Sequence, residues 1–331
     1  MKTKIVIAIA AVTIIAIASY FVLAGFGTTP APERLVIATT TSTVDTGLLD
    51  YLKPYFDNKF HANMTWLYLG TGQAITVASR GDADILLVHD RAKEDAFVQA
   101  GNGTHRVTIM YNDFILVGPA NDPADVKGTT NVTEAFRRIS SAGDAGNATF
   151  VSRGDSSGTN TAELKLWTAA KINPKGKLWY FEAGQGMGPT IRISNEKQAY
   201  TFSDRGTWLK LKSEMNATLS LQILLEGQNA LLNPYGIIQL NSTKYPNIKS
   251  KLAEQFFLFM TSDEGQSLIQ GFNVSNQQLF YPVFGKPETI GLPSEKDEIQ
   301  YWTQKLKDNQ MKAPSWVSQI IAVPVLTNPK D

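Results

Sequence analysis

The chain contains no cysteine, which excludes a disulfide framework, a zinc site with cysteine ligands and a thiol nucleophile. Its histidines are few and isolated from one another: His61, His89 and His105. We interpret each as a surface or buried structural histidine, because an isolated histidine is more often structural than a metal ligand or a general base. Composition therefore offers no thiol chemistry and no histidine cluster for a metal site, and our interpretation of the whole sequence includes no catalytic residue and no cofactor.

A strong charge of either sign is also missing. The 331 residues include 31 Lys and Arg against 30 Asp and Glu, which gives a formal net charge of +1. No dense basic run follows the first few residues, so the sequence lacks the electrostatic footprint of a nucleic-acid-binding protein. Any anion that this protein binds must therefore be small and held by local groups.

The N-terminus, in contrast, is distinctive. Basic residues precede a long apolar run, residues 5–24. A run of this length is either an export signal or a helix that spans a bilayer. We expect a signal or anchor helix over residues 1–26, retained as a membrane anchor, and a linker over residues 27–33. Phe26 stands where a lipidated cysteine would be, so we expect no lipid attachment.

A second feature also indicates the outside of the membrane. Asn-x-Ser/Thr sequons, the acceptors of N-linked glycans, are more frequent than their chance rate. They lie at Asn63, Asn102, Asn131, Asn147, Asn216, Asn241 and Asn273. We expect an extracytoplasmic, glycan-bearing protein of the cell surface, of archaeal type. The alternative is that Asn and Thr are simply plentiful in polar loops.

Short β-branched runs alternate with longer helical runs after the linker, which is typical of α/β architecture with parallel strands. The segments 113–121 and 233–241 are apolar and indicate two strands that cross between domains. A domain that is interrupted in this way by a second one makes a hinged clamp. We predict lobe I over residues 34–115 plus 235–285, and lobe II over residues 116–234.

The last part of the chain is less informative. Residues 245–272 predict two helices joined at "TSDEG", with Ser262 as the N-cap of the second helix. Residues 286–331 form a polar, amphipathic C-terminal extension, to which we assign no role.

Polar turns precede the helices at several predicted strand ends. These junctions are "TTTSTVDTG" (39–47), "LGTGQ" (69–73), "SRGDSSGT" (152–159) and "EAGQGMG" (182–188). Each offers unpaired N–H groups of a helix start, and the first and third add hydroxyls, which together are the donors that a tetrahedral oxyanion needs. Open α/β sheets bind ligands at this edge. Taken singly, each junction is also an ordinary helix cap.

Arg153 differs from the hydroxyls of the third junction. A buried guanidinium offers fixed donors plus charge, and hydrogen bonds to charged groups contribute about 1.5–3 kcal/mol. The alternative for Arg153 is a surface ion pair with Asp155.

The same junction also permits an enzymatic interpretation. Residues 154–158, "GDSSG", match the G-x-S-x-G of a nucleophile elbow with Ser156 as the nucleophile. In hydrolases of that fold the histidine follows the serine, whereas every histidine here precedes Ser156. The pattern also approximates the "GDSGG" of chymotrypsin-like proteases, but alternating strands and helices contradict an all-β fold. A surface-anchored serine hydrolase is therefore the weakest alternative.

Several of these segments together resemble tungstate-binding proteins of ABC transporters. The resemblance covers residues 34–285 and includes "LVIATTTSTVDTGLLDYLKPYF", "GTGQAI", "GDADILLVHDRAKEDAFV", "FVSRGDSSGT" and "AYTFSDRGTW", in that order. It implies a two-lobed, periplasmic-binding-protein-like fold of type II. It further implies a receptor that encloses tungstate, in some members also molybdate, and delivers it to a membrane permease driven by a cytoplasmic ATPase.

The resemblance also implies the residues of the site. Donors from the first and second junctions are Thr40, Thr41, Ser42 and Thr71, and donors from the third are Arg153, Ser156, Ser157 and Thr159. Gly72 and Gly158 give backbone access. Asn160 stands where the family is expected to have histidine, so residue 160 is left without a ligand role.

We therefore expect a solute receptor, not an enzyme, that holds a tungstate oxyanion with mostly neutral donors in a dehydrated cleft. Tungsten would enter only as the oxyanion, so no metal ligands are needed. The alternative receptor binds phosphate, since a carboxylate such as Asp155 can accept the proton of a monohydrogen phosphate.

Overall fold

The computed structural model describes residues 30–274 and 276–308 of the chain. The expected signal or anchor helix, residues 1–26, lies outside this part, as does the end of the C-terminal extension, residues 309–331. Within the described ranges, no helix combines the length and the apolar character that crossing a membrane requires. The N-terminal anchor therefore stays a prediction.

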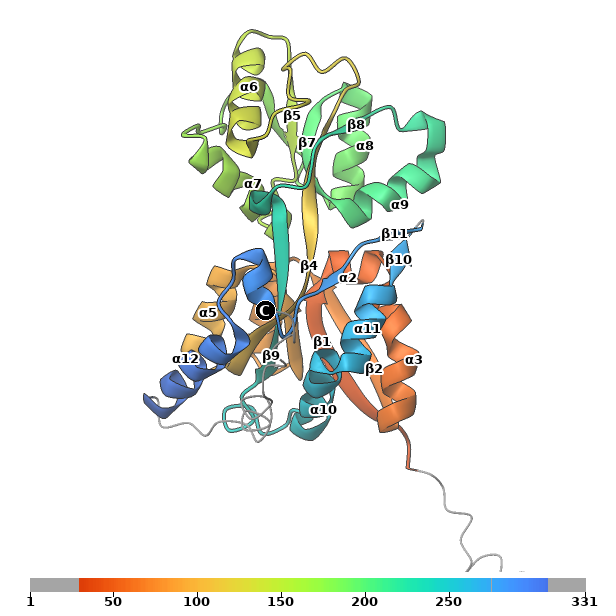
Figure 1. The fold of residues 1–331 in the computed structure, drawn as a ribbon, viewed down its shortest axis with the longest axis vertical. Coiled ribbons are helices and arrows are strands. Elements are labelled where there is room, and N and C mark those ends of the chain that lie inside the picture. Colours follow the sequence, from red (N-terminus) through yellow and green to blue (C-terminus); the bar gives the residue numbers. More distant parts are fainter. Residues whose placement is uncertain (1–29, 275, 309–331) are drawn as a thin grey trace, which may run out of the picture. The chain divides into compact units, whose positions relative to one another are not determined.

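Ten strands form one sheet (Figure 1). Its strands are β1 (Glu33–Thr40), β2 (Ala62–Leu69), β3 (Ile85–Val88), β4 (Gly103–Gly118), β5 (Phe150–Ser152), β6 (Tyr180–Glu182), β7 (Tyr200–Asp204), β8 (Gln222–Leu225), β9 (Leu232–Leu240) and β12 (Tyr281–Pro282). The order is β2-β1-β3-β9-β4-β7-β5-β6, and β8 and β12 also pair with β4. A separate hairpin joins β10 (Asn273–Val274) and β11 (Gln277–Gln278).

Helices alternate with these strands, which confirms the predicted α/β architecture. They are α2 (Thr41–Asp45), α3 (Leu48–Phe60), α4 (Thr71–Ser79), α5 (Arg91–Gln99), α6 (Val132–Asp144), α7 (Gly158–Ala169), α8 (Met187–Lys197), α9 (Arg205–Met215), α10 (Ser250–Thr261), α11 (Asp263–Gly271) and α12 (Glu295–Asp308). Short 3₁₀ turns are η1 (Asn216–Thr218), η2 (Asn229–Leu231) and η3 (Pro287–Ile290). β1 and β3 run parallel, as do β7, β5 and β6.

Two strands connect the two groups of helices. β4 and β9 pair antiparallel from Gly103 opposite Leu240 to Asp113 opposite Leu232. β9 also pairs with β3, whereas the end of β4 pairs with β7, so the two strands run from one group into the other (Figure 1). The predicted crossing segments, 113–121 and 233–241, lie largely in these strands.

The buried apolar side chains gather in three clusters. One consists only of residues between 114 and 231, and packs Phe136 edge-on against Trp167 with ring centroids 4.5 Å apart. A small cluster lies around Ala38, and the largest includes the edge-to-face pair Phe56 and Phe256. Separate cores are what two lobes require. The lobe boundaries themselves remain a prediction.

The C-terminal part packs against the strands that precede it. Ser262 caps α11, accepting a hydrogen bond from the N–H of Gly265 (3.2 Å), as predicted. In α12, Glu298 accepts from the buried Arg106 of β4 (3.1 Å), whose Nε also bonds Glu94 of α5 (2.7 Å). The side chains of Arg106, Glu94 and Glu298 are each at most 2% exposed to solvent. The described part of the extension is therefore tied to β4 and α5.

Candidate anion-binding site

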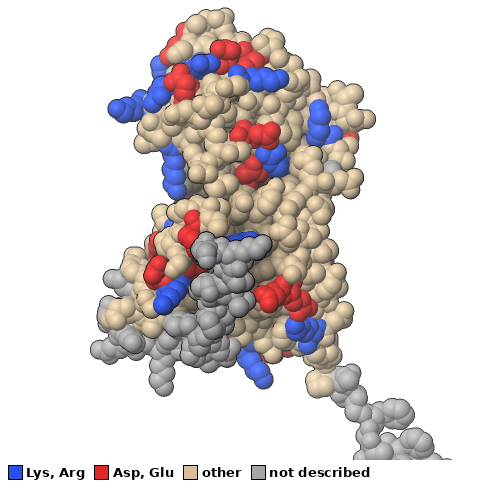
Figure 2. All heavy atoms as spheres, in the orientation of Figure 1, with Lys and Arg blue, Asp and Glu red and all other residues tan. Residues whose placement is uncertain are grey.

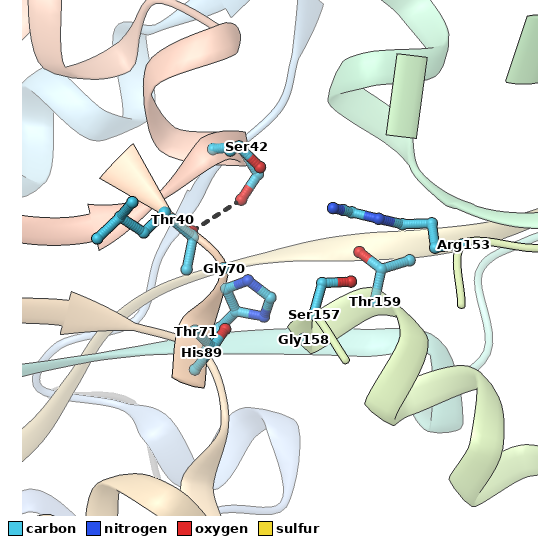
Figure 3. A pocket seen from close by; sticks show the side chains of 11 residues that line it. Thr40, Ser42, Gly70, Thr71, His89, Arg153, Ser157, Gly158 and Thr159 are labelled. Atoms are coloured by element: carbon cyan, nitrogen blue, oxygen red, sulfur yellow. Dashed lines mark hydrogen bonds between the residues drawn. The ribbon is translucent and has the colours of Figure 1, made fainter. Parts of the chain in front are cut away.

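Three helix starts meet at one small cavity, which Figure 3 shows from close by. The helices are α2, α4 and α7, and they follow β1, β2 and β5. The cavity is small, with a volume of about 10 Å³, far below the range of pockets for drug-sized ligands. Its lining residues are Thr40, Thr41, Ser42, Leu69, Gly70, Thr71, His89, Arg153, Ser157, Gly158 and Thr159. Any ligand of this cavity must therefore be small.

The first turn is held by its own hydroxyl groups. Thr39 Oγ1 donates to the carbonyl of Leu87 (2.8 Å) and lies 2.7 Å from Thr43 Oγ1. Thr43 Oγ1 also donates to the carbonyl of Thr40 (2.8 Å). In the cavity wall, Ser42 Oγ lies 3.1 Å from Thr40 Oγ1 and 2.8 Å from the Tyr235 hydroxyl. The hydroxyls of Thr39 and Thr43 thus hold the backbone of the turn, whereas Thr40 and Ser42 line the cavity.

The second turn supplies Leu69, Gly70 and Thr71. Thr71 is fully buried, and its Oγ1 has no hydrogen-bond partner within the part of the chain that the structure describes. A buried polar atom that stays unpaired is costly, so such an atom at a cavity wall is suited to pair with a bound ligand. Gly72, which we expected in the site, is exposed and does not line the cavity.

The third turn contributes the one lining residue with a formal charge, Arg153. Its guanidinium extends toward Ser42 in Figure 3, and the side chain is 8% exposed. Nη2 and Nε donate to Asp155 Oδ2 at 2.5 Å and 3.1 Å. The ion pair that we considered as the alternative is therefore present, but its Arg153 is buried and lines the cavity, whereas Asp155 is an exposed residue outside the wall.

The serines of this turn differ in position. Ser157 is the N-cap of α7, accepts from the N–H of Asn160 (3.2 Å) and lines the cavity with Gly158 and Thr159. Ser156 has a positive φ of 59°, is exposed, and does not line the cavity. Its N–H donates to Asn160 Oδ1 (3.1 Å). The turn that presents Ser157 thus directs Ser156 to solvent.

A buried polar network supports the third turn from beneath. Asn160 Nδ2 donates to Ser152 Oγ (3.1 Å), which in turn donates to Glu163 Oε2 (2.5 Å). Glu163 Oε1 accepts from Trp167 Nε1 (2.9 Å) and from the Tyr180 hydroxyl (2.7 Å). Burial raises the pKa of Glu163 to about 7, against these hydrogen bonds, which lower it. Asn160 therefore faces the interior and positions the turn, which explains why it lines no cavity.

The fourth polar turn, residues 182–188, does not contribute to the cavity. α8 begins at Met187 after the N-cap Gly186, and no residue of 182–188 lines the cavity. Conversely, sequence reasoning missed Leu69, Gly70 and His89. The signal for His89 was its place directly after the buried strand β3, at the same edge of the sheet as the first two turns.

The surroundings of the cavity suit an anion without a proton. The lining residues include no carboxylate. Asp155 lies outside the wall, where its Oδ2 accepts from Arg153 and its Oδ1 from the N–H of Ser157 (3.1 Å). In the described ranges, no group of three His, Cys, Asp or Glu side chains could hold a metal ion.

Known proteins match most of the chain. A family model described as PBP superfamily domain matches residues 27–264. An ABC transporter anion-binding protein of Haloferax volcanii is 46% identical over 291 residues, or 87% of this chain and 84% of its own. The tungstate-binding protein TupA of Peptoclostridium acidaminophilum is 44% identical over 243 residues, which are 73% of this chain and 82% of the TupA chain. The solved structure of TupA from Desulfovibrio alaskensis is 45% identical and has a TM-score of 0.68. The match covers 76% of this chain and 98% of the TupA chain.

Proposed function

Since this chain belongs to the PBP superfamily and to the same family as the TupA proteins, we propose that it is an extracytoplasmic receptor for tungstate. It is a solute-binding protein and not an enzyme. In this proposal it captures tungstate, or molybdate as a close analogue, and hands the anion to the permease of an ABC transporter, which a cytoplasmic ATPase drives. No cofactor is needed, because tungsten enters only as the oxyanion.

The observation that carries the proposal is the chemistry of the cavity wall. Hydroxyls and helix N–H groups from three turns converge with a single guanidinium, and no carboxylate is present. Such donors replace the hydration shell of a small dianion while only Arg153 adds charge. We propose that the ligand contacts are made by Thr40, Thr41, Ser42, Thr71, Arg153, Ser157, Gly158 and Thr159.

Phosphate is the alternative that the site favours less. A monohydrogen phosphate carries a proton at neutral pH and gains from a carboxylate that accepts it. Asp155, the carboxylate of this turn, lies outside the cavity wall and is hydrogen-bonded to Arg153 and Ser157. Tungstate, molybdate and sulfate bring no proton, so the wall suits them better.

A serine hydrolase finds less support. Ser156, the nucleophile of that hypothesis, is exposed, stands outside the cavity wall and is followed by no histidine. Its N–H is bonded to Asn160, which holds the serine in a turn.

The membrane is the next partner in this proposal. We propose that residues 1–26 anchor the receptor to the outer side of the membrane, close to its permease. Nucleic acid is not a proposed partner, and the face in Figure 2 carries basic and acidic side chains interspersed. Of the sequons, Asn102 and Asn241 are buried and hydrogen-bonded. We propose that glycans are confined to the exposed sites: Asn63, Asn131, Asn147, Asn216 and Asn273.

Native mass spectrometry and calorimetry on the full-length chain, purified in detergent, test this proposal. We expect one tungstate or molybdate per chain, and no displacement by phosphate at about 100-fold excess. Binding of phosphate in preference to tungstate would contradict the assignment, and binding of sulfate alone would keep the site but change its ligand.

A further inference from the structure

His89 has an unused polar atom at the cavity wall. The residue follows β3 directly and precedes α5, and it lines the cavity beside Thr71 and Gly158 (Figure 3). Its Nδ1 is buried and has no hydrogen-bond partner among the residues that the structure describes. Because a buried nitrogen gains from a partner, this atom is available for a contact with a ligand in the cavity.

The ring that carries this atom is held in place. It lies against Tyr235, with ring centroids 4.8 Å apart. On another side it faces the start of α7, where a Cβ added at Gly158 would come within 2.3 Å of His89 Cε1. Gly158 is therefore the residue that allows the imidazole and α7 to approach so closely. With these neighbours the ring has little freedom to turn Nδ1 away from the cavity.

The contacts of the ring also reach the two strands that link the lobes. The Tyr235 hydroxyl, on β9, accepts from Asn112 Nδ2 of β4 (3.2 Å). Asn112 Oδ1 in turn accepts from Asn233 Nδ2 of β9 (2.7 Å), and Asn233 is also a hydrogen-bonding neighbour of His89. The imidazole thus lies between the cavity and the polar cluster of β4 and β9.

The charge state of His89 follows from its surroundings. Burial lowers the pKa of His89 to about 4, the charge of Asp90 raises it in part, and the charge of Arg153 lowers it further. The imidazole is therefore neutral at neutral pH and carries one N–H. A neutral N–H donor can face an anion without placing a second cation next to Arg153 in the empty site.

We propose that His89 is a further ligand-binding residue, whose Nδ1–H donates a hydrogen bond to the oxyanion in the cavity while its Nε2 accepts from the side-chain amide of Asn233. This inference rests on the proposed function and adds a donor that the resemblance did not include. In it, His89 is the one aromatic donor of the wall, and it reaches the anion from lobe I, opposite the start of α7.

Substitution of His89 provides the first test. His89→Leu keeps a side chain of similar bulk but removes both nitrogens, and we expect it to weaken tungstate binding by ~10-fold in calorimetry. His89→Asn places an amide N–H near the position of Nδ1, and we expect it to bind within about 3-fold of the original protein. Unchanged affinity in His89→Leu, or equal losses in both variants, would overturn the role as a donor.

Nitrogen NMR of the original protein tests the same point without a mutation. The chain has only three histidines, so ¹⁵N-histidine labelling gives few signals, and His61→Asn, at an exposed position, serves as the control for assignment. We expect Nδ1 of His89 to carry a proton in the tungstate complex and that proton to exchange slowly with water. An unprotonated Nδ1 in the complex would overturn this inference alone, whereas a protein that binds no oxyanion at all would overturn the proposed function.

Discussion

The first and third turns of the site look alike in sequence and differ in how they are built. "TTTS" and "SRGDSSGT" both place hydroxyls before a helix. The first turn is fixed by hydrogen bonds among its own threonines and carries no charge. The third turn holds Arg153 and rests on the buried network of Asn160 and Glu163. Two similar motifs therefore contribute differently to the site. The first turn supplies neutral donors, and the third supplies a charged donor that a buried hydrogen-bond network holds in position.

The largest effect is expected from the charge of the third turn. Arg153→Ala removes the only formally charged group of the wall and leaves Asp155 unpaired beside the cavity. We expect tungstate binding to weaken by at least ~10-fold, because a charge-assisted hydrogen bond contributes about 1.5–3 kcal/mol. Calorimetry measures this, with the surface variant Arg80→Ala as the control. An affinity equal to that of the original protein would remove Arg153 from the site.

A smaller effect is expected where the third turn meets lobe I. The new methyl group of Gly158→Ala would overlap the ring of His89. We expect binding to weaken by about 10-fold, since the two sides of the cavity can no longer approach fully. Gly186→Ala is the control, because Gly186 is exposed, lies outside the cavity wall, has no positive φ and leaves open space for a methyl group. Equal binding by Gly158→Ala and the original protein would show that this contact is not needed for capture.

A substitution of Thr71 tests the contribution of the second turn to the site. Thr71→Val removes the unpaired hydroxyl and keeps the shape of the side chain. We expect the unliganded protein to gain up to about 1 kcal/mol in its free energy of unfolding, because a buried unsatisfied group is lost. Tungstate binding should weaken by about 3- to 10-fold. Chemical denaturation with and without the anion measures both, and a loss of stability without a loss of affinity would contradict the assignment.

The buried carboxyl group of Glu163, beneath the third turn, should make the stability of the protein depend on pH. Glu163 has a pKa of about 7 in the folded protein against 4.5 ordinarily, so the folded state holds its proton longer than the unfolded state does. The free energy of unfolding should therefore fall as the pH rises between these values, by roughly 3 kcal/mol from this group. Glu163→Gln should lose this part of the slope, measured by denaturation at about pH 5 and about pH 8. An identical slope in both proteins would contradict a protonated Glu163.

Much of the fold follows from patterns in the sequence, because alternating strands and helices need only local periodicity. β4 is an instructive exception, since its first half was not predicted. Residues 103–110 are all buried, yet they include Arg106 and His105, which break the apolar pattern. Glu94 and Glu298 pair with Arg106 inside the protein, and these partners come from distant parts of the chain.

The same distinction applies to the site. Hydroxyls next to a helix start could be located from the sequence, because the turn and the helix lie together in the chain. Ser156 and Gly72 belong to the right turns, but only the three-dimensional path shows that they face solvent. His89 was interpreted as structural, because nothing in its neighbourhood in the sequence reveals that Gly158 and Thr71 lie beside it.

The most direct test of the account is the position of tungsten in a crystal of the complex. Anomalous scattering at the tungsten absorption edge locates the metal without any assumption about the protein. The account predicts one strong peak enclosed by Thr71, His89, Arg153 and Ser157. A peak on the surface, or none in the cavity at saturating tungstate, would contradict it.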